Sequence, residues 1–175
     1  MLALTRRAAL AAAALGLLTT SSLPGDASAQ AALADGQADG TLTVNGKITK
    51  VAYAYARSVP GFFDKNATDT QVIVSDVPLD AAALADDFQR IDMAKAGKLH
   101  AFEITIDASG TPVSTAWRHN GFEGPMPSGL SSDDVFTKKI LDGKTVEGSY
   151  KSAAPAEFFG NTYAFDLAFR AAIAP

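Results

Sequence analysis

The stretch from Asn161 to Arg170, near the end of the chain, constrains the fold more than any other. It reads NTYAFDLAFR, with bulky apolar side chains on one parity and small or charged side chains on the other. Because successive side chains of a strand point to opposite faces, this stretch predicts a strand with one apolar face. On a helix, the same aromatic rings would scatter around the axis. The apolar face needs a sheet to cover it, and we expect the preceding chain to supply that sheet.

Two dipeptides mark hairpins in the preceding chain. Asn45-Gly46 joins residues 41–44 to residues 47–56, and Asp142-Gly143 joins 134–141 to 144–151. Asn-Gly and Asp-Gly are the strongest short hairpin signals, because both turn positions require a positive φ. Three further alternating segments are residues 70–75, 98–107 and 111–119.

The strands together predict an all-β fold with eight strands joined mainly by hairpins. Eight such strands can close, the last onto the first, into a small antiparallel barrel without exposed edges. A two-sheet sandwich is the alternative, because periodicity does not distinguish the two architectures. In residues 47–56, tyrosines alternate with alanines, a pattern that suits a closed or tightly curved sheet.

One segment, residues 80–96, departs from the strand pattern. Leu84, Phe88 and Ile91 are spaced as on one face of a helix, and Asp80 is a suitable N-cap. We therefore predict a helical insertion that covers one end of the sheet. The pair Asp86-Asp87 could divide it into two short helices.

The start of the chain predicts export. A short basic segment precedes an apolar run that is too short to span roughly 30 Å of hydrocarbon, and Ala27-Ser28-Ala29 fits a cleavage site. Thr5-Arg6-Arg7 resembles a twin-arginine signal, although Ala9 stands where an aromatic residue is usual, so both export routes stay open. We predict a signal peptide at 1–29, a flexible leader at 30–39 and a single β domain at 40–175. The expected location is the periplasm or the medium, with no membrane span.

Composition narrows the expected partners. The chain carries a formal net charge of −4 and contains no cysteine. An acidic protein is poorly suited to nucleic acid or anionic membranes, and a chain without cysteine has neither disulfides nor thiolate chemistry.

Several short motifs resemble those of small exported bacterial β-domain proteins with no assigned activity. The resemblance covers nearly the whole of the expected mature chain and implies a β-type domain, but it brings no catalytic residues. The motifs are TLTVNGK at 41–47, AYAYA at 52–56, SDVPL at 75–79, GKLH at 97–100, GKTV at 143–146 and FFGNTY at 158–163.

Aromatic residues form the first candidate site. Tyr53, Tyr55 and Trp117 could line the mouth of the barrel and bind a small apolar molecule. The same rings could instead fill the core, because an eight-stranded barrel is only just wide enough for its own side chains.

The two histidines form the second candidate site. In a hairpin of 98–107 with 111–119, His100 lies opposite residue 118 or 119, so the imidazoles of His100 and His119 should approach each other. With Glu123 nearby, a zinc site is conceivable. No ligand spacing supports it, so we predict neither a metal nor another cofactor.

These observations favour a non-enzymatic binding or interaction module that takes a small apolar ligand or a protein partner. The candidate ligand-binding residues are Tyr53, Tyr55, His100, Trp117 and His119. The alternative is a metal-dependent or other hydrolytic enzyme that uses His100 and His119 near the loop at 120–133. A structural or inhibitory surface protein acting through that loop is a third interpretation.

Overall fold

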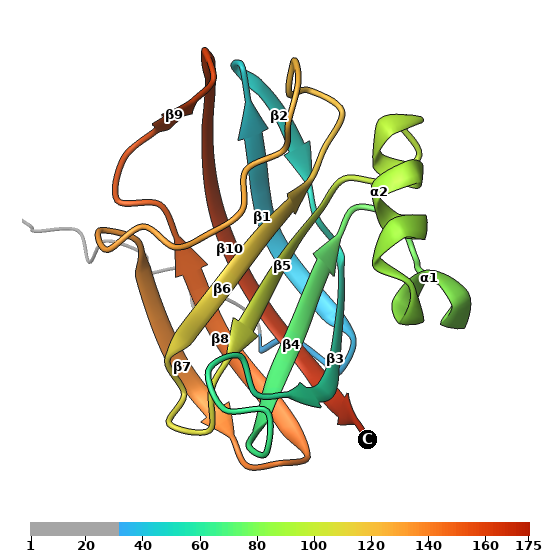
Figure 1. Ribbon diagram of the computed structural model, residues 1–175, viewed down its shortest axis with the longest axis vertical. Coiled ribbons are helices and arrows are strands. Elements are labelled where there is room, and N and C mark those ends of the chain that lie inside the picture. The colour runs from blue at the N-terminus through green and yellow to red at the C-terminus, as the bar shows by residue number, and fades with distance from the viewer. Residues whose placement is uncertain (1–31) are drawn as a thin grey trace, which may run out of the picture. The chain divides into compact units, whose positions relative to one another are not determined.

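An antiparallel sheet, curled into a half-barrel, dominates the fold (Figure 1). The computed structural model describes residues 32–175, so the predicted signal peptide at 1–29 lies outside the described residues. The helices are α1 (Ala81–Ala85) and α2 (Asp87–Lys95). The strands are β1 (Gln37–Val44), β2 (Lys47–Lys50), β3 (Tyr53–Pro60), β4 (Thr68–Ser75), β5 (Ala101–Ile106), β6 (Pro112–Arg118), β7 (Val135–Leu141), β8 (Thr145–Lys151), β9 (Ala156–Phe158) and β10 (Asn161–Ala174).

Eight strands follow one another across this sheet in the order β6-β5-β4-β3-β1-β10-β8-β7. The last strand pairs with the first as predicted, in a register from Gln37 opposite Arg170 to Val44 opposite Tyr163. The all-β antiparallel fold with a helical insertion is therefore confirmed. The sandwich alternative is wrong, because these strands form one continuous sheet. The strand order ends at β6 on one side and at β7 on the other. The segment that follows β6 runs back alongside β6, and Trp117 N donates to Pro127 O at 3.0 Å.

The inner face of the sheet holds the main core. Phe165, Leu167 and Phe169 of β10 are almost fully buried, which confirms the predicted apolar face of this strand. Phe165 stacks on Phe102 of β5 with ring centroids 4.5 Å apart, and Phe102 meets Trp117 edge-on at 5.2 Å. Aromatic rings thus fill the interior between strands that are distant in the sequence.

The strand predicted at 47–56 is divided. Val51 and Ala52 separate β2, which pairs with β1, from β3, which continues to Pro60 and pairs with β4. β1 begins at Gln37, so the last three residues of the predicted leader belong to the sheet.

Both helices lie on the outer face of the sheet (Figure 1). Asp86 ends α1 through its N–H to Ala82 O, and its carboxylate caps α2 by accepting from Phe88 N at 2.8 Å. The predicted division of the helix at this point is confirmed. The predicted apolar face is wrong at Phe88, whose side chain is 78% exposed. The chain restarts its helix at Asp86, so Arg90 and Ala94 face the sheet instead. No helix in residues 32–175 is long and apolar enough to cross a membrane.

Candidate functional site

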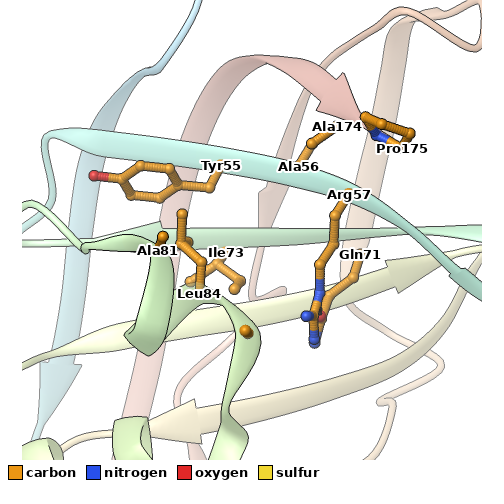
Figure 2. A pocket seen from close by; sticks show the side chains of 10 residues that line it. Tyr55, Ala56, Arg57, Gln71, Ile73, Ala81, Leu84, Ala174 and Pro175 are labelled. Atoms are coloured by element: carbon orange, nitrogen blue, oxygen red, sulfur yellow. Dashed lines mark hydrogen bonds between the residues drawn. The ribbon is translucent and has the colours of Figure 1, made fainter.

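A recess lies between helix α1 and the outer face of β3 and β4 (Figure 2). Its volume is about 330 Å³, and most of its surface is apolar. This volume is at the lower end of the range typical of small-molecule sites. The lining residues are Tyr55, Ala56, Arg57, Gln71, Ile73, Ala81, Leu84, Ala85, Ala174 and Pro175.

The alternation in β3 forms one wall of the recess. Ala54 and Ala56 are buried toward the inner face, so Tyr55 and Arg57 project from the outer face. Tyr55 is fixed there, because its hydroxyl oxygen accepts a hydrogen bond from Leu79 N at 2.9 Å. Tyr55 also packs against the small core beneath the helices, which includes Ile73 and Leu79. This wall of the recess is therefore preorganised.

Helix α1 forms the opposite wall. The helix begins after Asp80, whose carboxylate accepts from Ala83 N at 2.8 Å. Ala83 is buried against the sheet, whereas Leu84 is half-buried and Ala85 is exposed. The small side chains on this helix leave the space that a larger residue would fill.

The polar end of the recess is formed by Arg57 and Gln71. Arg57 Nε donates to Gln71 Oε1 at 2.7 Å, and Gln71 Nε2 donates to Glu103 Oε2 at 3.2 Å. Figure 2 shows the Arg57 and Gln71 side chains extending together from neighbouring strands. The recess therefore combines apolar walls with one cationic, oriented group.

The two histidines come together as the predicted hairpin requires. Their ring centroids are 4.4 Å apart at an interplanar angle of 50°. His100 immediately precedes β5 and His119 immediately follows β6, whose paired ends bring the rings to one end of the sheet. The predicted approach of the imidazoles is confirmed.

His100 is arranged as a cation. Its Nδ1 lies 2.7 Å from Asp76 Oδ2 and its Nε2 lies 2.9 Å from Asn120 Oδ1, so both nitrogens face acceptors. The hydrogen bond to Asp76 raises the pKa of His100 against the opposing effect of burial. Burial alone would raise the pKa of Asp76, but the hydrogen bonds from His100 outweigh it and lower that pKa.

His119 is arranged as a neutral ring. Gly121 N donates to its Nδ1 at 2.9 Å, which leaves the proton on Nε2, 3.2 Å from Thr49 Oγ1. Burial lowers the pKa of His119 to about 4, and the positive charge of His100 acts in the same direction. The surroundings of the pair thus favour a proton on His100 and disfavour one on His119.

The histidine pair gives little support to the predicted alternative of a metal-dependent enzyme. All four ring nitrogens already have partners, and Glu123 meets this region through its backbone N–H, which donates to Asn161 Oδ1 at 3.0 Å. Within residues 32–175, no group of three or more histidine, aspartate or glutamate side chains is placed to hold a metal ion.

The remaining predicted residues lie elsewhere. Trp117 is buried in the interior, where it also lines a small, mainly polar hollow of about 90 Å³ beneath the segment 127–131. Tyr53 is half-buried near the start of β3. A further hollow, of about 160 Å³, lies next to His119, and neither Trp117 nor Tyr53 lines it. The five predicted residues therefore do not share one site, and of them only Tyr55 lines the recess.

Sequence reasoning missed Arg57, Gln71 and Leu84 as site residues. The parity that places Tyr55 on the outer face also places Arg57 there, and this was the available signal. Nothing in the sequence indicated that α1 would lie over this part of β3 and β4. Comparison of the chain with family models, curated proteins and solved structures finds no match.

Proposed function

We propose that this chain is an exported, non-enzymatic binding protein, and that its binding site is the recess between α1 and the outer face of β3 and β4. The observation that carries the proposal is the recess itself, about 330 Å³ in volume, with apolar walls and one oriented cation. The expected ligand is a small, largely apolar molecule. The basic and apolar start of the sequence supports a location in the periplasm or the medium.

The outer recess suits this role better than the inside of the half-barrel. Rings such as Phe102, Phe165 and Trp117 fill the interior, where the hollow measures only about 90 Å³. A hollow of about 460 Å³ beside α2 is more open, and Asp86, Asp92 and Lys98 contribute to its lining. Burial of apolar ligand surface is the main source of affinity for such a molecule, and the recess offers the most apolar wall of these three hollows.

A thermal-shift experiment with two matched tryptophan variants tests the site. Octanoate and 1-octanol serve as apolar probes, because a ligand that binds only the folded protein raises its melting temperature. Ala85→Trp should fill the recess and abolish the shift. Ala82→Trp, on the same helix and also exposed but outside the lining, should retain it. The proposal fails if neither probe stabilises the unaltered protein, or if Ala85→Trp still responds.

A further inference from the structure

A row of polar side chains crosses the outer face of four adjacent strands and ends at the recess. Arg57 on β3 donates to Gln71 on β4, which donates to Glu103 on β5. Glu103 also accepts from Arg90 Nε of helix α2 at 2.8 Å. Arg118 on β6 completes the row, with its Nε 3.1 Å from Glu103 Oε1 in an ion pair that lacks the alignment of a hydrogen bond.

The charges in this row do not balance. Three guanidinium groups, on Arg57, Arg90 and Arg118, accompany two carboxylates: that of Glu103 and that of Asp87, the first residue of α2, which pairs with Arg90 and Arg118. Both carboxylates are engaged by Arg90 and Arg118 through direct ion pairs. Arg57 forms no ion pair with any side chain of residues 32–175. The surplus positive charge therefore lies at Arg57, the member of the row that lines the recess.

The guanidinium of Arg57 is also held ready for a ligand. Its Nε donates to Gln71 on the neighbouring strand β4, and Arg57 is half-buried. A guanidinium fork pairs best with a planar carboxylate, and fixing it before binding reduces the entropy lost on association. The row thus presents one oriented positive charge beside an apolar wall formed by the half-buried side chains of Tyr55 and Leu84.

We infer that the ligand is an aliphatic monocarboxylate whose carboxylate pairs with Arg57 and whose hydrocarbon chain lies against Tyr55 and Leu84. This inference rests on the proposed function, because it specifies the ligand class of the same recess. One surplus charge matches one carboxylate. A multiply charged anion would be repelled more strongly by the net negative charge of the whole chain.

Calorimetric titration with two probes of equal chain length tests the ligand class. The unaltered protein should bind octanoate roughly tenfold or more tightly than 1-octanol, because hydrogen bonds to a charged group are the stronger kind. Arg57→Gln should remove this preference and leave 1-octanol binding unchanged. Lys50→Gln, an exposed cation on β2 outside the recess, removes the same charge and should preserve the preference.

The outcomes separate this inference from the proposed function. If octanoate and 1-octanol bind equally, or if Arg57→Gln keeps the preference for octanoate, the monocarboxylate inference is overturned while the recess remains a binding site. If neither probe binds the unaltered protein, both proposals are overturned. If Lys50→Gln also removes the preference for octanoate, the preference comes from the overall charge of the protein, and the role of Arg57 is overturned.

Discussion

At the scale of single residues, the two histidines show how neighbours set the charge of a side chain. His100 has a carboxylate and an amide oxygen as partners, so it favours the proton. His119 accepts a backbone N–H and is 1% exposed, so it excludes the proton. Lys47 contributes positive potential at both rings, which disfavours a second charge there. The two histidines should therefore affect stability in opposite directions as the pH changes.

His119 should make the protein less stable in mild acid. Its pKa in the folded protein is about 4, below the ordinary value of 6.5, so the unfolded chain takes up a proton first as the pH falls. The stability due to the neutral ring is complete above pH 6.5 and is lost as the pH falls towards 4. Urea denaturation across this range should show a falling free energy of unfolding, and His119→Gln should flatten the decline. A decline that is unchanged in His119→Gln would contradict this account.

His100 should act in a separate pH window. Its pKa is raised above 6.5, so the stability from its charged pairing with Asp76 is complete below pH 6.5 and is lost as the pH rises through the folded value. The destabilisation caused by His100→Gln should therefore be larger at pH 6 than at pH 9. NMR titration of the imidazole Hε1 signals gives an independent check, since His100 should titrate above 6.5 and His119 far below it. Titration of both rings near 6.5 would refute the assignment.

At the scale of elements, helix α2 shows why an apolar pattern can mislead. Leu84, Phe88 and Ile91 have the spacing of one helical face, yet Phe88 lies in solvent. Asp86 starts a new helix. Arg90 of this helix lies fully buried against the sheet, because its guanidinium forms an ion pair with the carboxylate of Glu103. Sequence patterns assign charged residues to the surface. They give no signal for a buried ion pair whose partners belong to different elements.

Loss of the buried carboxylate should loosen this helix. Glu103→Gln removes the charge that pairs with Arg90 and Arg118, and breaking a buried ion pair costs roughly 3–5 kcal/mol. Amide hydrogen exchange within α2 should accelerate along with the loss of stability in urea. Glu157→Gln, an exposed position on β9, is the matched control and should change stability by about 0.5 kcal/mol or less. Equal effects of the two substitutions would show that Glu103 does not anchor α2.

At the scale of the whole molecule, local sequence patterns predicted the strands but did not predict every pair of neighbouring strands in the sheet. The alternation from Tyr163 to Phe169 and the Asn45-Gly46 turn were sufficient to predict β10 and the first hairpin. The sequence did not predict that the strand order would end at β6 and β7, because strand order depends on contacts between distant segments. The recess escaped prediction for the same reason, since its walls come from α1 and β3, more than twenty residues apart.

The first strand, β1, pairs with the last strand, β10, and the two backbones approach each other closely at Gly40. Gly40 of β1 lies opposite Leu167 of β10 at a φ of +130°, and a Cβ at this position would lie 2.0 Å from Asp166 O. Only glycine adopts this conformation readily, and a methyl group here would push β1 away from β10.

Gly40→Ala should therefore destabilise the fold by roughly 3 kcal/mol or more, through backbone strain combined with the forced separation of the strands. Gly46→Ala separates these two causes. Gly46 also has a positive φ, of 77°, but a Cβ there would have no atom within 4 Å. Its cost should be about 1 kcal/mol, from backbone conformation alone. Urea denaturation of both variants measures the difference. Because β1 and β10 pair along the full length of β1, Gly40→Ala should also speed amide exchange on both strands, whereas Gly46→Ala should affect only the turn. Similar losses in the two variants would show that the close approach at Gly40 does not hold β1 and β10 together.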